Sequence, residues 1–521
     1  MSDPSSAPAE APQTRSPTAP LRHLGKRRLL MLLLGLIVGT EFLENGMFVF
    51  AASHIMGGID AAPAEFAQVL AAYAIGSLLM IVSQQWLSRH LGYRRYLFAS
   101  LALFTLGALG CAFCSNLQEM TLARLLQGFG GGALFTSSRV LVPQLFSVRE
   151  RPLAVKHFML MLFGLSAAGP ALAAALVEND GWRSVFLVVV PLALLAMAGA
   201  WWLLPDAVGR GERPVRWAAA PLLLFAAAIT LVQTGLAQAR YAFFSDPIRL
   251  SLLAAAGLAL LGAFIWQQWR HDEPLLRVRD LAHPAYFVGL GLYFMHYAMS
   301  GASSYLFPVL AERGLGLPLA TVGWLNTFAA ALGLATAYAY IKLGSRFANK
   351  KPLMLAGALA MALAAWLFSR IAPAVPAGAL LPALTAKGVA SALLVLPVAG
   401  LTFRELGEQR FAHAYQGKNL MRQIAQSIAP ALAAIALEDR EFANQSSIAA
   451  AAQAGDWLQT LQAGLSARGL PQADAHIAAM ADLARQVAQQ ALLASCADLY
   501  RLLAVVALGT ALAVLAQRRL R

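Results

Sequence analysis

Long apolar runs separated by short polar connections make up most of the chain. Fourteen of these runs are long enough to cross a bilayer as helices, at about 20 residues for each crossing. They cover residues 29–53, 66–88, 95–115, 118–143, 155–178, 182–204, 216–237, 248–270, 284–310, 320–343, 352–370, 377–403, 412–437 and 492–517. The pattern predicts an all-α polytopic membrane protein with fourteen transmembrane helices.

The order of these runs divides the chain into larger units. We expect an N-terminal six-helix half at 29–204, two inserted helices at 216–270, and a C-terminal six-helix half at 284–517. Residues 1–28 precede the first run and begin with a segment rich in Pro, Ala and Ser, which predicts a disordered tail.

One connection, residues 438–491, is much longer than the others and lies inside the C-terminal half. It is rich in Ala and Gln, and its apolar residues recur at helical spacing. They are Trp457, Leu458, Leu461 and Leu465, followed by Ile477, Met480, Leu483 and Val487. The segment is interpreted either as a solvated helical cap or as a docking surface.

The composition agrees with the membrane assignment. Charged residues make up 13% of the chain and hydrophobic residues 59%, with a mean hydropathy of +0.61. Soluble domains carry about 25% charged residues, so the apolar content does not reflect a large soluble core.

The net charge of +14 reflects topology and not nucleic-acid binding. Connections on one side of the predicted membrane, together with both chain ends, hold 26 of the 40 Lys and Arg residues. Because basic residues concentrate in cytoplasmic loops, both termini are expected in the cytoplasm.

No pattern typical of a catalytic site is present in the sequence. It contains no phosphate-binding glycine loop, zinc-ligand spacing or nucleophile with a base. Cys111 and Cys114 form CAFC within an apolar run and are interpreted as small buried side chains. The sequence therefore predicts neither an enzyme nor a bound cofactor, and leaves an ion gradient as the energy source.

A basic loop motif occurs twice. The first copy is QWLSRHLGYRR at 85–95, with Gly92 permitting a tight turn before Arg94 and Arg95. A weaker copy, KLGSRFANKK at 342–351, includes Arg346 and follows six spans later if the inserted pair is skipped. This recurrence indicates two related halves.

Two further motifs contain small residues that let membrane helices approach closely. The fourth run carries LARLLQGFGGGA at 122–133, with Arg124 and Gly128, and the fifth carries GLSAAGPALAA at 164–174, with Gly169 and Pro170. A guanidinium at the position of Arg124 lies inside a membrane helix, where a charged side chain is usually functional.

Together these motifs resemble the major facilitator superfamily, and most closely its fourteen-helix drug:proton antiporter branch. The resemblance runs in order from about 29 to 204 and is weaker from 284 to 437, and RLLQGFGG is its most specific element. Residues 489–508 are also similar to that branch's last span. The chain departs from the family pattern at Gln85 (usually Gly) and Arg89 (usually Asp), and at Ala173 and Ala174 (usually both Gly).

The resemblance also implies a role for an acid in the first run. That branch carries an aspartate, then an alanine seven residues on and an apolar residue eleven on, and Glu44, Ala51 and Ile55 reproduce this spacing. Glu44 is therefore expected to be the proton-coupling acid, whereas Glu41 has no such match.

The physical setting of these acids supports a specific role. A carboxylate near the bilayer centre costs roughly 2.5–3.5 kcal/mol, so Glu41 and Glu44 are unfavourable unless a partner or a function compensates for them. At 1.5 Å per residue, Glu44 lies about 13 Å and Arg124 about 9 Å from the outer ends of their helices, so the two are expected to pair. A purely structural ion pair is the alternative to a coupling role.

Other polar residues lie within the predicted spans of the C-terminal half. Lys387 and His296 are near mid-depth and are candidates for the proton or substrate path, with packing roles as the alternative. Lys418 and Arg422, with Arg139 from the first half, are interpreted as snorkelling toward the membrane surface.

The function expected from these observations is proton-coupled export of amphipathic organic compounds (multidrug efflux) by alternating access in a bacterial inner membrane. A dedicated exporter of an endogenous metabolite is one alternative, and a non-transporting membrane sensor or enzyme is another. Resemblance to Gram-negative relatives implies a periplasmic adaptor and an outer-membrane channel as partners, besides the substrate and membrane lipid.

Overall fold

Helices make up the secondary structure throughout the part of the chain that is described. The computed structural model describes residues 23–206, 208, 219–243, 245–271, 274–373, 375–404, 406, 408–454 and 457–520. Of the predicted tail at 1–28, residues 1–22 lie outside the described residues, and the rest is helical. The first helix includes His23, and Arg27 near its start forms an ion pair with Glu150.

The N-terminal group of helices follows the order of the predicted spans. It comprises α1 (His23–Phe50), α2 (Ala52–Gly58), α3 (Pro63–Leu91), α4 (Tyr93–Phe113), α5 (Leu117–Gly131), α6 (Leu134–Leu145), α7 (Arg151–Asp180), α8 (Ser184–Leu187) and α9 (Val189–Leu203).

The remaining helices form the inserted pair and the C-terminal group. The inserted pair is α10 (Ala219–Ala242) and α11 (Pro247–Arg270). The C-terminal group comprises α12 (Pro284–Pro308), α13 (Leu319–Leu343), α14 (Lys351–Phe368), α15 (Leu381–Leu393), α16 (Val395–Thr402), α17 (Glu408–Ala454), α18 (Trp457–Ala467) and α19 (Gln472–Ala516). Short segments η1 (Arg279–Leu281), η2 (Val309–Gly314), η3 (Gly344–Arg346) and η4 (Ala377–Leu380) connect some of them.

Twelve helices in the described chain are long and apolar enough to cross a membrane. The two other predicted spans differ for separate reasons. The run at 118–143 is divided at Gly132 into α5 and α6, of 15 and 12 residues. The run at 284–310 forms the 25-residue helix α12, whose Gly, Tyr, Ser and His residues lower its hydropathy.

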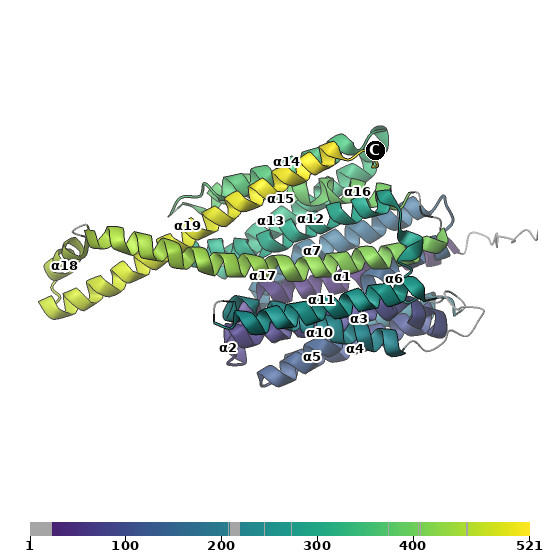
Figure 1. The fold of residues 1–521 in the computed structure, drawn as a ribbon, viewed down its shortest axis with the longest axis horizontal. Coiled ribbons are helices and arrows are strands. Elements are labelled where there is room, and N and C mark those ends of the chain that lie inside the picture. The colour runs from purple at the N-terminus through teal and green to yellow at the C-terminus, as the bar shows by residue number, and fades with distance from the viewer. Residues whose placement is uncertain are drawn as a thin grey trace, which may run out of the picture.

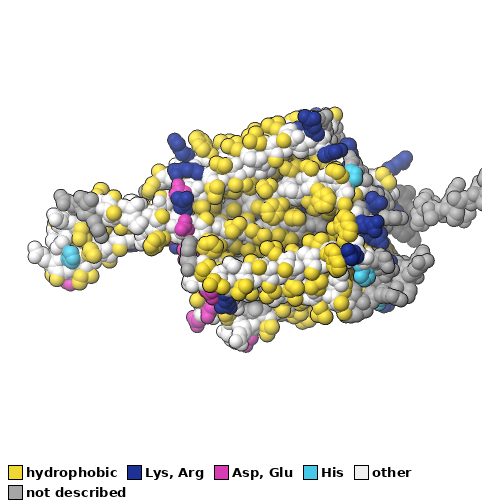
Figure 2. Space-filling view, viewed as in Figure 1, with side chains coloured by type: hydrophobic (Ala, Val, Ile, Leu, Met, Phe, Trp, Pro, Cys, Tyr) yellow, Lys and Arg dark blue, Asp and Glu magenta, His cyan; other side chains and the backbone are white. Residues whose placement is uncertain are grey.

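The side chains on the surface separate into an apolar band and two polar ends (Figure 2). One end carries the α3–α4 turn, the α6–α7 loop, η3 and residue 520, and we call it the basic end. At the opposite end α17 and α19 continue out of the bundle, and we call it the hairpin end (Figure 1). An apolar band with polar ends is the surface expected of a bilayer-spanning bundle.

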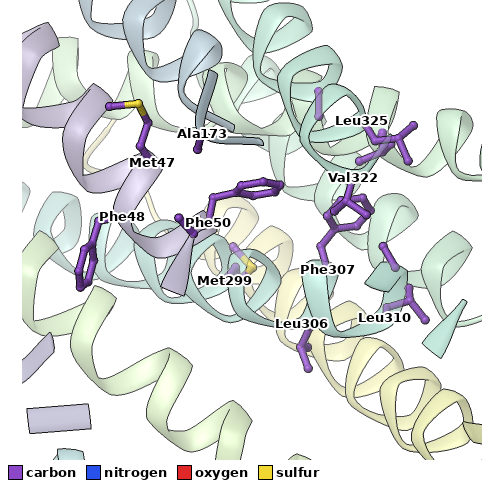
Figure 3. Close-up of a cluster of buried hydrophobic side chains, with 14 of the residues drawn as sticks. Met47, Phe48, Phe50, Ala173, Met299, Leu306, Phe307, Leu310, Val322 and Leu325 are labelled. Carbon is purple, nitrogen blue, oxygen red and sulfur yellow. The ribbon is translucent and has the colours of Figure 1, made fainter. Parts of the chain in front are cut away.

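The N-terminal and C-terminal groups meet where α7 packs on α13 and where α17 packs on α3 and α6. Toward the hairpin end, apolar side chains of α1, α7, α12 and α13 pack together, including Phe50, Ala173, Phe307 and Val322 (Figure 3). The inserted helix α10 packs on α3 and α17, whereas α11 packs mainly on α10 and exposes Leu252 and Trp266.

The segment at 438–491 is helical, as its spacing predicts, but it does not form a separate cap. It consists of the continuations of α17 and α19 with α18 at the tip, so two spans extend into one protruding hairpin (Figure 1). Ala475 and Ala479 are buried within the hairpin, whereas Ile477 and Met480 are 67% and 50% exposed.

Candidate proton and substrate site

A fully buried ion pair joins α1 to α5 near the centre of the bundle. Arg124 Nη1 donates hydrogen bonds to Glu44 Oε1 at 2.6 Å and to Gln127 Oε1 at 2.7 Å. Glu44 is 0% exposed and Arg124 2%. The contact predicted from the depths of the two residues is therefore present.

Aromatic rings enclose the guanidinium of this pair. Its Cζ atom lies 3.8 Å from the ring centroid of Phe48 and 4.3 Å from that of Tyr73. Asn45 Nδ2 donates to the hydroxyl of Tyr73 at 2.7 Å, which fixes that ring. Since rings attract cations through their faces, the positive charge of Arg124 is stabilised without solvent.

Gly128 permits the close approach of α3 that places Tyr73 there. A Cβ atom at Gly128 would lie 2.3 Å from the carbonyl oxygen of Tyr73, closer than any side chain tolerates. The motif at 122–133 therefore supplies both the arginine and the small residue that lets α3 and α5 pack around it.

A second buried pair connects the N-terminal and C-terminal groups. Arg422 Nη2 of α17 lies 3.5 Å from Glu41 Oε1 of α1. Arg422 Nε donates to Asn419 Oδ1 at 2.8 Å, and Asn419 Nδ2 donates to Thr136 Oγ1 of α6 at 2.7 Å. The pair thus belongs to a polar network that crosses between the two groups.

The interpretation of Lys418 and Arg422 as snorkelling residues is wrong. They are 4% and 5% exposed and face the N-terminal group, because polar residues along the same side of α17 bond to α3 and α6. Gln416 Nε2, for example, donates to the carbonyl oxygen of Ile81 at 2.7 Å, and Gln423 Nε2 donates to Ser77 Oγ at 2.5 Å. The sequence signal was the recurrence of Gln416, Asn419 and Gln423 at helical spacing with Arg422.

Lys418 lies among aromatic side chains. Its Nζ atom is within 4.4–5.6 Å of the ring centroids of Phe135, Tyr293, Tyr415 and Tyr297. Of the other predicted residues, His296 packs edge-on against Tyr297, with ring centroids 5.2 Å apart, and so borders this group.

The remaining basic candidate, Lys387, lies elsewhere in the C-terminal group. It is on α15, and its Nζ atom is 5.2 Å from the ring centroid of Phe307. Phe307 belongs to the apolar cluster toward the hairpin end (Figure 3), so Lys387 is not brought together with Glu41 or Glu44.

The loop-motif residues lie at the basic end. Gly92 has φ +77°, which explains the glycine at the α3–α4 turn. Arg94 pairs with Asp206 at 3.0 Å and covers the ring of Trp201, whereas Arg95 and Arg346 are exposed.

The motif in α7 faces both groups of helices. A Cβ atom at Gly169 would lie 3.5 Å from the carbonyl oxygen of Leu43 in α1, and one at Gly323 of α13 would lie 2.9 Å from the carbonyl oxygen of Pro170. Gly169 and Pro170 therefore lie where α7 contacts α1 on one side and the C-terminal group on the other.

The model of one protein family, described as the Major Facilitator Superfamily, matches residues 34–430. The chain belongs to the major facilitator superfamily. Members of this superfamily are transporters, so the chain is a transporter and not an enzyme.

Similar curated proteins are 23–31% identical to this transporter over the aligned residues. "Putative multidrug resistance protein MdtD" of Cronobacter sakazakii is 25% identical over 76% of this chain and 83% of its own length. "Uncharacterized transporter YebQ" of Escherichia coli is 31% identical over 49% of this chain and 55% of its own length.

A solved structure shares the fold. The crystal structure of an auto-inhibited peptide transporter of the POT family superposes with a TM-score of 0.58 at 15% identity, covering 93% of this chain and 97% of that chain. The comparison supports the major facilitator fold, with two six-helix halves and two inserted helices, that the sequence resemblance implies.

Proposed function

We propose that this transporter exports amphipathic organic compounds in exchange for protons, by alternating access between its two halves. The observation that carries the proposal is the buried Glu44–Arg124 pair, an acid and its counter-ion held at the centre of the bundle away from solvent. The names of the MdtD relatives, which describe multidrug resistance, support the substrate class.

The surroundings of Glu44 suit a group that takes up and releases a proton. Burial favours the neutral carboxyl, whereas Arg124 and its hydrogen bond favour the carboxylate. Glu44 Oε2 is buried and accepts no hydrogen bond from the described residues, so it is the oxygen on which a proton would sit. A modest change in the position of Arg124 would then change the occupancy of that proton.

The Glu41–Arg422 pair supplies a link between the halves. Glu44 and Arg124 both belong to the N-terminal half, so a rigid rotation of the halves leaves their contact intact. Glu41 and Arg422 belong to opposite halves, so the same rotation changes their 3.5 Å separation. We propose that this second pair stabilises the present packed arrangement and breaks as the basic end opens.

The distribution of charge supports an orientation in the membrane, and the exposed side of the hairpin supports a partner. We propose that the basic end faces the cytoplasm of a bacterial inner membrane, because cytoplasmic loops carry the excess of Lys and Arg. The hairpin of α17, α18 and α19 then points into the periplasm, where its exposed Ile477 and Met480 offer apolar contacts to an adaptor protein connected to an outer-membrane channel.

Transport in reconstituted liposomes tests the proposed exchange. With a pH gradient imposed across the membrane, addition of a transported dye is expected to drive proton flux that collapses with a protonophore. Binding of the dye without any proton flux would contradict the exchange and favour a non-transporting sensor. Substrate movement that is unaffected by the pH gradient would show a transporter without proton coupling.

A further inference from the structure

Where the two halves meet, the side chains nearer the basic end carry more positive than negative charge. Arg139, Lys418 and Arg422 lie there, on α6 and α17, and neighbouring cations share rings. Arg139 and Lys418 both cover Tyr415, at 5.9 and 4.9 Å from its centroid, and Lys418 and Arg422 both cover Phe135, at 4.4 and 5.0 Å. The three side chains therefore form one cluster.

One carboxylate accompanies these three cations. Glu41 and Glu44 are the buried carboxylates among the described residues, and Glu44 forms an ion pair with Arg124. Glu41 contacts Arg422. Arg139 and Lys418 therefore have no carboxylate partner in the described part of the chain, and two positive charges of the cluster are uncompensated.

Aromatic rings solvate Lys418 but do not neutralise it. The four rings around its ammonium group attract it through their faces, yet none carries a formal charge. Lys418 makes no hydrogen bond or salt bridge within the described residues, although it is only 4% exposed. Uncompensated intramembrane lysines commonly mark the path of a substrate or ion.

We infer that Lys418 and Arg139, with the surrounding rings, form a binding site for an amphipathic organic anion, such as an aromatic carboxylate. The anionic group pairs with Lys418 and Arg139, and its apolar body contacts Phe135, Tyr293 and Tyr297 of α6 and α12. Arg422 stays paired with Glu41, one helical turn farther along α17 from Lys418. The inference rests on the proposed export function, because it assigns the charge of the exported compound.

The position of the cluster fits export. It lies at the interface between the halves, on the basic-end side of Glu41, where a compound arriving from the cytoplasm would first meet the central residues. The acid assigned to proton exchange, Glu44, is one turn farther toward the hairpin end and has its own counter-ion. The anion and the proton therefore use separate side chains, and the movement of the halves links them.

Three probes with the same ring system test the charge preference. Purified full-length protein is titrated by equilibrium dialysis with 2-naphthoate, 2-naphthamide and 2-naphthylmethylammonium, with empty micelles as the blank. The anion is expected to bind most tightly. Lys418→Met is expected to weaken binding of the anion about tenfold or more while changing binding of the amide less than about twofold, and Lys418→Arg is expected to retain most of the affinity.

A matched control and a second variant keep the test independent of folding. Lys342→Met removes an exposed lysine that covers Tyr338 at the basic end and is expected to leave all three affinities unchanged. Arg139→Gln is expected to weaken binding of the anion selectively, like Lys418→Met. Each variant is compared by gel filtration and thermal unfolding, and Arg139→Gln provides the test where Lys418→Met does not fold.

The outcomes separate this inference from the proposed export. Three results would overturn the anion site. They are an equal loss of affinity for all three probes in Lys418→Met, tighter binding of the cation than of the anion, and no saturable binding of the anion. Anion binding that depends on Lys418 but drives no proton flux in liposomes would instead contradict proton exchange and leave the site standing.

Discussion

The two buried glutamates are three residues apart, but their arginine partners lie in different halves of the transporter. Glu44 bonds to Arg124 within the N-terminal half, whereas Glu41 contacts Arg422 across the interface. A pair inside one rigid body responds to protonation, and a pair between two bodies also responds to their relative movement. In the proposed exchange, the first pair would hold the proton and the second would respond to which side of the transporter is open.

Glu44→Gln is expected to abolish substrate-induced proton release. Removing one partner of a buried pair leaves Arg124 uncompensated, at a cost of about 3–5 kcal/mol. The double variant Glu44→Gln/Arg124→Gln removes both charges and is expected to fold better while also releasing no proton. Glu44→Asp is expected to keep part of the release, because it preserves the carboxyl group.

The release is measured with a pH-sensitive dye in weakly buffered detergent solution. Each variant is first checked for a single symmetric gel-filtration peak. Full proton release by well-folded Glu44→Gln would remove this residue from the exchange and make Glu41 the next candidate.

Glu41→Gln is expected to loosen the contact between the halves at the basic end. If the variant destabilises the packed arrangement by about 1–2 kcal/mol relative to the open one, the ratio of the two populations shifts about 5- to 30-fold. Spin labels at Leu91 of α3 and Phe347 near η3 are expected to show a larger population of long distances. Arg27→Gln, which removes an exposed pair within the N-terminal half, is the control, and an unchanged distance distribution in Glu41→Gln would exclude the proposed link.

One ion pair could be predicted from the sequence and the other could not, for a physical reason. Glu44 and Arg124 belong to early helices with recognisable motifs, and their depths follow from the helical rise. The partner of Glu41 depends on how the second half docks against the first, and no local pattern encodes that. The interpretation of Lys418 and Arg422 is wrong for the same reason. A position near the end of a helix does not show whether a side chain faces lipid or the other half of the protein.

At the scale of helices, the division between α5 and α6 shows how motif and packing interact. The predicted span at 118–143 contains the glycines that bring α5 against α3 and α4, and the helix is interrupted where they end. The apolar pattern predicted helical structure in this run but not its interruption, because a turn at Gly132 depends on the neighbours that the backbone contacts. The same pattern located the hairpin residues as helical without revealing that they continue α17 and α19.

Replacing Gly128 by leucine is expected to destabilise the protein by about 1–3 kcal/mol, because α3 and α5 cannot approach without a clash. The displacement of Tyr73 is expected to lower transport as well. Gly262→Leu on α11 is the matched control, since a Cβ atom there meets no neighbour within 4 Å. Thermal unfolding in detergent gives the comparison, and equal stability of the two variants would contradict the packing argument.

The exposed side of the hairpin is expected to contact an adaptor protein. A photo-crosslinking residue at Ile477, which is 67% exposed, should capture that adaptor in cells, whereas the same residue at the buried Ala475 should not. Mass spectrometry identifies the product. Replacing residues 455–471 by a short linker should abolish export across both membranes but preserve transport in liposomes, and unchanged export by this variant would contradict a docking role.

At the scale of the whole molecule, the fold was predictable because its main determinants are local. Apolar runs specify the spans, the repeated loop motif indicates two halves, and the charge of the connections distinguishes the ends. The protrusion of the hairpin and the packed state of the interface were not predictable, since both depend on contacts between distant segments.

The orientation of the molecule is tested by labelling single cysteines in intact cells. In a background with Cys111, Cys114 and Cys496 replaced by alanine, a membrane-impermeant maleimide is expected to label Ser446→Cys in the hairpin. It is expected to label Ala348→Cys at the basic end only after the membrane is broken. The reverse pattern would place the basic end outside the cytoplasm and contradict the proposed direction of export.

The length of α17 would convert a small rotation of the halves into a large displacement of the hairpin. This helix of 47 residues carries Arg422 at the interface and ends at Ala454, about 48 Å farther along its axis if Pro430 leaves it straight. A rigid rotation of about 15°, comparable to known subunit rotations, would swing that end by about 12 Å. If an adaptor binds the hairpin as proposed, its contact residues would move by about this distance whenever the halves rotate.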